Sequence, residues 1–354
     1  MPLLLVTSLS VTTFTHANKD VSSIFNSDFS HLVQTYSLAN NGDADAQYDL
    51  AVMYDTGRGV VVDGKEAHMW YLRAAEQGNV YAQNNLGVIY DKGNKDILED
   101  DKEAFEWYRK AANQGYANAQ NNLAVMYDRG GKGVLKDDNA ALIWYRKAAD
   151  QGYADAQYTL GWRHAKGKGV LKDYEIAIKW FLKAAEQGNI YAQNNLAVMY
   201  NTGQGVVKDN QVALSWYLKA AEQGNIYAQN NLGAMYDKGV DGVLEDDIEA
   251  LKWYRKAAEQ GYANAQYNLA LMYDHGGKGV LENNKEAVKW YQKLAQRGYA
   301  NSQYNLGVMY QNGEGVTKDM VKAKFWIKKA HESDNAEASK IAKENWDKFE
   351  LWKY

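Results

Sequence analysis

Residues 187–209 read QGNIYAQNNLAVMYNTGQGVVKD, and closely related phrases occur at 77–98 and 223–244. Successive copies lie 36 or 37 residues apart, and a fixed period in this range is typical of proteins built from stacked repeats. The sequence therefore predicts eight units between about residues 43 and 334. Each copy is marked by an alanine that precedes glutamine, with serine in the eighth: Ala46, Ala82, Ala119, Ala156, Ala192, Ala228, Ala265 and Ser302.

The first part of each unit has the pattern of an amphipathic helix. Leucine lies four residues after the marker alanine in all eight units, and tyrosine lies eight residues after it in seven. These positions share one helical face with the alanine. Glycine follows three residues after the tyrosine position in every unit, as Gly203 does. Since a helix often ends at a glycine with positive φ, the first helix is expected to end there.

A second helix follows in every unit and carries tryptophan at one position, for example Trp180 and Trp216. Alanine stands three residues earlier, and alanine or Leu294 stands four residues later. Such small residues let a neighbouring helix come close while the indole fills the remaining space. The sequence predicts an all-α, right-handed superhelical solenoid of antiparallel helix pairs.

The repeated pattern Ala-Gln-x-x-Leu-(Gly/Ala)-x-x-Tyr-x-x-Gly-x-Gly-Val-x-x-Asp, followed by Ala-x-x-Trp, resembles the Sel-one-like repeat. Residues 192–224 match it nearly in full, and the resemblance covers about residues 43–334. It implies a tetratricopeptide-like fold and a non-enzymatic adaptor or scaffold, often exported in bacteria. A cysteine-rich branch of the family is linked to β-lactam binding or hydrolysis, but this chain has no cysteine.

Both ends depart from the repeat. Residues 1–17 are apolar and rich in hydroxyl groups, which indicates a secretory signal peptide and an exported, periplasmic or secreted protein. If they are not a signal, the expected location is the cytoplasm. Residues 18–42 are expected to form a linker and a capping helix, and residues 335–354 a second capping helix, because terminal repeats need more polar outer faces.

Composition excludes several functions. The net charge is −4 and the pI is near 5.9, which argues against a nucleic-acid-binding protein. The six histidines show no metal-ligand spacing, and no nucleophile with its base or phosphate-binding loop is recognisable. We therefore expect no catalytic residues, metal, cofactor or membrane span, and a monomer that binds a protein or peptide.

The candidate site is the helical face opposite the core stripe of the first helix, here called the partner face. It comprises the positions −1, +2, +6 and +9 relative to the marker alanine, and the family resemblance implies that it lines a concave groove. The candidate residues are Tyr81, Asn84, Asn118, Asn121, Asp128, Trp162, Tyr191, Asn194, Asn201, Tyr227, Asn230 and Asp237.

Their chemistry suits a peptide. Asparagine is a poor helix former, so its recurrence within a helix asks for a reason, and its amide offers both a donor and an acceptor to a peptide backbone. Tyrosine adds contact area, and the aspartates would favour a basic or polar segment. The alternative is that these side chains are solvated or hydrogen-bond between repeats.

The fourth unit differs, because Trp162-Arg163-His164 replaces the usual Val-Met-Tyr. Trp162 is expected to be exposed on the partner face as a binding hot spot, or else the unit is locally repacked. Glutamine at +1 is expected to satisfy backbone groups of a neighbouring unit. The Lys or Arg three residues after each Trp is expected to lie on a solvated face.

The sequence thus favours a protein-interaction module whose partner segment lies in the groove, in host interaction or envelope assembly. One alternative is a structural scaffold of an envelope complex that has no peptide groove. The other is a hydrolase acting on cell-wall or β-lactam amides.

Overall fold

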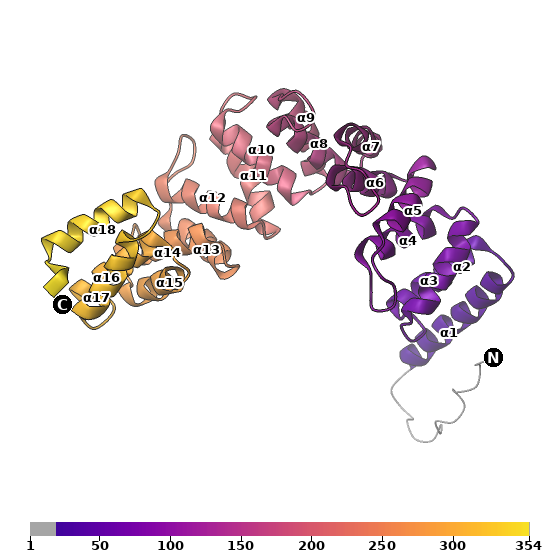
Figure 1. Ribbon diagram of the computed structural model, residues 1–354, viewed down its shortest axis with the longest axis horizontal. Coiled ribbons are helices and arrows are strands. Elements are labelled where there is room, and N and C mark those ends of the chain that lie inside the picture. Colours follow the sequence, from indigo (N-terminus) through magenta and orange to yellow (C-terminus); the bar gives the residue numbers. More distant parts are fainter. Residues whose placement is uncertain (1–18, 354) are drawn as a thin grey trace, which may run out of the picture. The chain divides into compact units, whose positions relative to one another are not determined.

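The computed structural model describes residues 19–353, without the side chains of residues 19–29 and 352. The signal peptide predicted at residues 1–17 lies outside this range. The regular elements of the described residues are all helices, apart from three isolated β-bridges (Figure 1). This confirms the all-α solenoid.

The described residues divide into two compact units, one that ends at Tyr153 and one that begins at Ala154. The first contains α1 (Lys19–Asn40), α2 (Ala44–Thr56), α3 (Gly64–Glu76), α4 (Val80–Lys92), α5 (Asp101–Asn113), α6 (Ala117–Arg129) and α7 (Asp138–Asp150). The second contains α8 (Ala154–Lys166), α9 (Tyr174–Glu186), α10 (Ile190–Thr202), α11 (Asn210–Glu222), α12 (Ile226–Lys238), α13 (Asp247–Glu259), α14 (Ala263–His275), α15 (Asn284–Gln296), α16 (Ala300–Asn312), α17 (Met320–His331), α18 (Ala336–Lys348) and a short 3₁₀ helix (Leu351–Lys353). Even-numbered helices from α2 to α16 are the first helices of the eight repeats, and α3 to α17 are the second.

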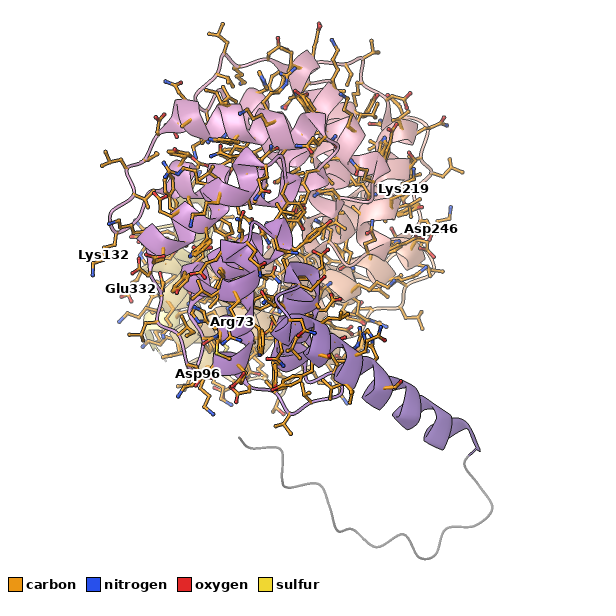
Figure 2. All side chains as sticks on the ribbon, turned by 90° about the vertical axis from the view of Figure 1, so that its right-hand side faces the viewer. Arg73, Asp96, Lys132, Lys219, Asp246 and Glu332 are labelled. Atoms are coloured by element: carbon orange, nitrogen blue, oxygen red, sulfur yellow. The ribbon has the colours of Figure 1, made fainter. Side chains whose placement is uncertain are left out.

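The glycine that ends each first helix has the expected positive φ, between 57° and 82°. Its ψ depends on repeat length. In 36-residue repeats it is left-handed, as at Gly203 (ψ 29°), whereas in 37-residue repeats it is extended, as at Gly130 (ψ −171°). The extra residue widens the loop, which is closed in three repeats by a β-bridge such as Gly131↔Val134. These loops carry charged side chains away from the ribbon, as Lys132 does in Figure 2.

An aspartate, or Asn283 in the seventh repeat, caps the N-terminus of each second helix. The Asp209 carboxylate, for example, accepts hydrogen bonds from the backbone N–H groups of Gln211 and Val212. A side-chain acceptor at this position satisfies N–H groups that the helix itself leaves unpaired. The repeated aspartates therefore serve as helix caps, as the sequence indicates.

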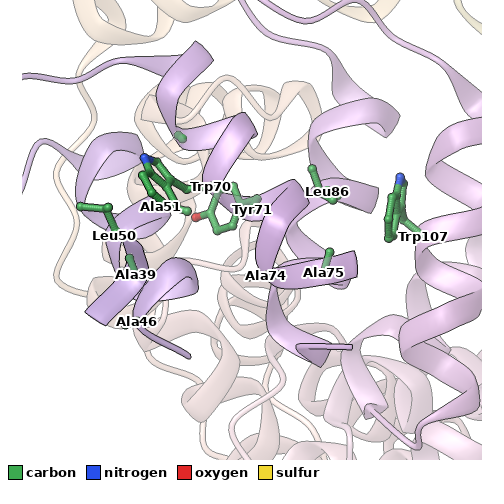
Figure 3. Close-up of a cluster of buried hydrophobic side chains, with 12 residues drawn as sticks. Ala39, Ala46, Leu50, Ala51, Trp70, Tyr71, Ala74, Ala75, Leu86 and Trp107 are labelled. Atoms are coloured by element: carbon green, nitrogen blue, oxygen red, sulfur yellow. The ribbon is translucent and has the colours of Figure 1, made fainter. Parts of the chain in front are cut away.

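The aromatic residue that fills each helix pair is the one after the tryptophan. Tyr71, Tyr108, Tyr217, Tyr254 and Tyr291 are at most 2% exposed. Figure 3 shows Tyr71 on the same helix as Trp70, with Leu50 and Ala51 nearby. The tryptophan is buried in several repeats, and the Lys or Arg three residues later in the same helix lies over its ring, as Arg73 does over Trp70.

Candidate partner-binding site

Three tyrosines of the partner face are well exposed: Tyr81 by 49%, Tyr191 by 52% and Tyr227 by 49%. Each is held against an aromatic ring of an adjacent repeat. Tyr81 packs between Tyr48 and Tyr116, with ring centroids 5.7 Å and 5.3 Å away. These three tyrosines are therefore exposed, as their position opposite the core stripe predicts.

In the second unit, Tyr191 packs against Tyr158 at 5.8 Å, and Tyr227 packs edge-on against Tyr262 at 5.4 Å. Tyr158 in turn contacts Phe181 of the core at 5.9 Å. Such ring pairs are worth about 0.5–1.5 kcal/mol beyond their area burial. The exposed rings are therefore oriented before any partner arrives.

The asparagines at +2 are mostly not available to a partner. Asn84 and Asn121 are only 7% and 9% exposed, so the prediction that they offer open hydrogen-bonding groups is wrong. For Asn84 the reason is a hydrogen bond from the next repeat. Nδ2 of Asn122 donates to Oδ1 of Asn84 at 3.2 Å. The alternative of hydrogen bonding between repeats holds here.

Asn230 takes part in the same ladder, since its Oδ1 accepts from Nδ2 of Asn268 at 3.3 Å. Asn118, Asn194 and Asn201 are partly buried. Oδ1 of Asn194 is shielded from solvent and has no hydrogen-bond partner. The fifth repeat therefore lacks the bond that Asn84 and Asn230 make.

The aspartates at +9 are also engaged. Asp237 is partly buried, and its Oδ2 accepts a hydrogen bond from the hydroxyl of Tyr254 at 3.3 Å. Burial raises the pKa of Asp237, although the hydrogen bond from Tyr254 opposes this. Asp128, at the same position of the third repeat, is also partly buried. The aspartates that were expected to favour a basic or polar segment thus also bond within the helix pair, as Asp237 does.

The sequence holds a sign of this pairing. Where the buried tyrosine of the second helix is replaced by Phe181 or Ile327, the +9 residue is no longer acidic but Ala165 or Gln311. Oε1 of Gln311 is buried without a hydrogen-bond partner. The fifth repeat departs from this pattern, because it has Asn201 at +9 together with the buried Tyr217. In the other seven repeats, comparing the two positions would have indicated that the aspartates are partners of tyrosine.

Trp162 is partly buried rather than exposed, which corrects the expectation at this position. It packs against the core cluster that contains Phe181 and lies near Lys168, whose Nζ is 5.7 Å from the ring centroid. Arg163, in the usual methionine position, is fully buried and its Nη1 donates to the Lys168 carbonyl at 3.3 Å. The local repacking that the sequence left open as an alternative is present.

Two repeated features bind neighbouring helices together. Nε2 of the +1 glutamine donates to the carbonyl of an alanine eight residues earlier, as Gln193 does to Ala185 at 3.1 Å, while its Oε1 accepts from the end of the next helix. The Lys or Arg after each Trp covers the indole rather than facing solvent alone; Nζ of Lys110 is 3.6 Å from the Trp107 centroid. Sequence analysis missed this second contact.

Among residues 19–353, no group of three His, Asp or Glu side chains is placed to hold a metal ion. In the same range, none of the helices combines the length and apolarity needed to cross a bilayer. The described part of the chain thus presents surfaces and cavities rather than a metal centre.

The geometry of eight two-helix repeats agrees with the family comparison. The model of the Sel1 repeat matches residues 44–79, 80–116, 117–153, 154–189, 190–225, 226–262, 263–299 and 300–335. The chain belongs to the Sel1 repeat family. Proteins of this family generally mediate protein–protein interactions and are generally non-enzymatic.

Two solved Sel1 repeat structures are similar over most of this chain. A protective antigen of uropathogenic Escherichia coli strains is 40% identical with a TM-score of 0.76, covering 87% of this chain and 65% of the antigen. The chain thus spans less than two thirds of that antigen. A Sel1 repeat protein from Oxalobacter formigenes is 34% identical with a TM-score of 0.64, covering 96% of this chain and 97% of the other. No curated protein matches the chain.

A cavity on the partner face of this Sel1 repeat protein lies in repeats that the sequence analysis did not single out. It has a volume of about 480 Å³ and is formed by α14, α16 and the adjoining loops. Its lining includes Tyr267, Leu271, Asp274, Tyr304 and Val308, which occupy the +2, +6 and +9 positions of repeats seven and eight. The candidate positions thus line a cavity in two repeats from which no candidate residue was chosen.

Proposed function

We propose that this Sel1 repeat protein is a non-enzymatic interaction module that binds a segment of another protein along the partner face. The observation that supports this best is the set of half-exposed tyrosines, Tyr81, Tyr191 and Tyr227, each fixed by a neighbouring ring. A ring held in place loses little conformational freedom on binding, and tyrosine is enriched at protein-binding surfaces. Hydrogen bonds to the bound backbone come from the partly buried asparagines rather than from the buried ones.

We also propose that the protein is exported and acts in the bacterial envelope or at the host surface. Residues 1–17 have the composition of a signal peptide, and the similar E. coli protein is described as a protective antigen. Detection of the full-length and shortened chains in cell fractions tests the export step. Retention of an unprocessed chain in the cytoplasm would contradict it.

Peptide display tests the binding function. Twelve-residue random peptides are selected against the full chain, and the affinities of the enriched peptides are measured by fluorescence polarisation. Changing Tyr191→Ala and Tyr227→Ala together is expected to weaken binding at least tenfold, because both rings supply contact area. Ile248→Ala is a matched control, since this side chain is 58% exposed on a second helix.

Circular dichroism of each variant establishes that the helices remain folded. If no peptide is enriched, or if the double variant binds as tightly as the original protein, the tyrosine surface is not the binding site.

A second candidate, a scaffold that docks through its loop edge, is favoured by a different observation. Seven inter-helix loops present an aliphatic side chain that is between 87% and 90% exposed: Val61, Leu98, Leu135, Leu171, Val207, Leu244 and Leu281. Single exposed aliphatic residues are common, but recurrence at one register is consistent with a docking edge. Changing Leu244→Ser and Leu281→Ser would reduce binding of the selected peptides only if this edge, rather than the tyrosines, forms the site.

A further inference from the structure

The cavity between α14 and α16 is acidic and aromatic at once. Asp274, Glu282 and Glu314 contribute carboxylates, and Tyr267 and Tyr304 contribute rings. The described residues that line this cavity include His275 but no Lys or Arg, so three carboxylates stand beside one imidazole. A concave surface lined by charge of one sign concentrates the opposite charge, so the cavity favours a cation.

The oxygen atoms in the cavity lining can accept more hydrogen bonds than the neighbouring side chains donate to them. Nδ2 of Asn284 donates to the Glu282 carboxylate, while Oδ1 of Asn284 is buried and accepts no hydrogen bond. Asp274 receives the hydroxyl of Tyr291 at 3.2 Å, and Glu314 receives Nδ2 of Asn312 at 3.1 Å. Each carboxylate still has lone pairs left for a cationic donor. No described set of three His, Asp or Glu side chains is arranged for a metal, which favours an organic cation.

The volume of this cavity can be compared with that of a second cavity at the equivalent place between two other repeats. The equivalent place between α8 and α10 holds a cavity of only about 110 Å³, whereas that between α14 and α16 is about 480 Å³. Both are lined by the same asparagine, valine and methionine positions: Asn195, Val198 and Met199 in one, Asn305, Val308 and Met309 in the other. The +6 residue differs, because Trp162 stands where the larger cavity has Leu271. The indole occupies space that leucine leaves open.

The two cavities also differ in charge, and the larger one is the more negative. Ala165, Lys166 and Gln204 line the smaller cavity at the positions that Asp274, His275 and Glu314 occupy in the larger one. The repeat architecture therefore produces a seam at both places, and of these two the seam between repeats seven and eight is the larger and carries more carboxylates. Negative charge is a property of these side chains and not of the fold.

We propose that this cavity receives a lysine or arginine side chain of the bound protein segment. The proposal rests on the proposed function, since the side chain belongs to a segment lying on the partner face. The carboxylates neutralise the cationic head, and the two tyrosines with Leu271 and Val308 contact the aliphatic stem. A volume of about 480 Å³ falls within the ordinary range for ligand sites, about 300–1,000 Å³.

A neighbouring cavity extends the same surface toward the C-terminal helix. It has a volume of about 210 Å³ and shares Tyr267, Tyr304 and Asn305 with the first. Glu337 of α18 lies at its wall and adds a carboxylate. The backbone of a bound segment can therefore continue across the tyrosines without meeting a Lys or Arg side chain among the described lining residues.

The test uses the full chain with ¹³C-labelled methyl groups and three short probes. These are Ac-Gly-Lys-Gly-NH₂, Ac-Gly-Arg-Gly-NH₂ and the uncharged Ac-Gly-norleucine-Gly-NH₂. The lysine and arginine probes are expected to shift the methyl resonances of Leu271, Val308 and Met309. The norleucine probe, tested at equal concentration, is expected to shift them at least fivefold less. Raising the salt concentration is expected to weaken the charged probes, because the cavity is open to solvent.

Variants locate the effect. Glu282→Gln with Glu314→Gln is expected to weaken the lysine probe at least fivefold. Glu245→Gln, the equivalent loop position in repeat six, serves as the matched control and is expected to change nothing. Leu271→Trp copies the residue of repeat four and is expected to abolish the shifts. Should that variant unfold, the glutamine variants alone decide, since both glutamates lie at exposed positions of loops.

Equal shifts from norleucine and lysine, or an unchanged affinity in the double glutamine variant, would overturn the cation site. The two proposals fail separately. Loss of peptide binding in the Tyr191 and Tyr227 variant, with no charge preference here, supports the partner face and rejects the cation site. If instead the charged probes shift the methyl resonances and the Tyr191 and Tyr227 variant binds the selected peptides normally, the cation site is supported and the tyrosine surface is rejected.

Discussion

In the sixth repeat, the hydroxyl of Tyr254 lies 3.3 Å from Oδ2 of Asp237 and donates a hydrogen bond to it, which joins the second helix to the first. The seventh repeat has the same bond between Tyr291 and Asp274 at 3.2 Å. The aspartate thus serves the helix pair first. Only where a cavity opens beside it, as at Asp274, is it also placed to meet a partner.

The stability contribution of Asp237 is expected to depend on pH. Burial raises its pKa, and the nearby Asp247 acts in the same direction. A raised carboxyl pKa means that the folded protein holds the proton more tightly than the unfolded chain, so stability falls as the pH rises through the raised pKa. Asn cannot ionise and can still accept from Tyr254. We expect the Tm difference, Asp237→Asn minus the original protein, to become more positive from pH 4 to pH 8.

Thermal unfolding followed by circular dichroism measures this difference. Asp241→Asn is a suitable control, because Asp241 is exposed in the loop between α12 and α13. A difference between Asp237→Asn and the original protein that does not change with pH would contradict the assignment.

The +1 glutamines are expected to be essential for the contact between successive repeats. Gln193 is 4% exposed and satisfies the Ala185 carbonyl. Its replacement by Ala removes this buried hydrogen bond and leaves the Ala185 carbonyl with the backbone N–H of Gly188 alone, which costs about 0.5–1.5 kcal/mol of unfolding free energy. Replacing its exposed donor, Gln223, should cost less than half as much. Urea unfolding compares the two variants, and equal losses would argue against the buried carbonyl as the cause.

The lysine that covers each tryptophan is expected to stabilise its helix. Lys110 over Trp107 forms a cation–π contact at a solvent-exposed position, for which about 0.5–1 kcal/mol is typical. Lys110→Met removes the charge but keeps the stem, and should lower the unfolding free energy by about this amount. Lys102→Met in the same helix is the control, and an identical effect from both changes would exclude a specific contact.

The small residue after the core leucine alternates, with alanine in odd repeats and glycine in even ones. A Cβ added at Gly233 would lie 2.7 Å from Cδ1 of Tyr254, so Gly233→Ala should destabilise the protein by about 1–3 kcal/mol through overpacking. Helix propensity alone would give a gain of up to about 1 kcal/mol. The sign of the change in urea unfolding therefore decides between close packing and propensity.

Much of the fold could be predicted from the repeated phrase because its period specifies which residues share a helical face. The eight repeats, the two helices in each and the glycine ends all follow from local rules and are found in the structure. The same rules predicted that Tyr81, Tyr191 and Tyr227 would be exposed. These properties depend on a single helix and its own backbone.

What the sequence alone determined is the repeat and the face of each helix on which a residue lies. The tertiary structure decided which of those residues remain open: Asn84 is covered by Asn122 of the next repeat, whereas Tyr81 is not covered. It also decided that Leu271 leaves a cavity where Trp162 nearly fills one. The physical reason is that helical periodicity specifies direction around one axis, while accessibility depends on how closely the next repeat packs and on which side chains meet across that seam.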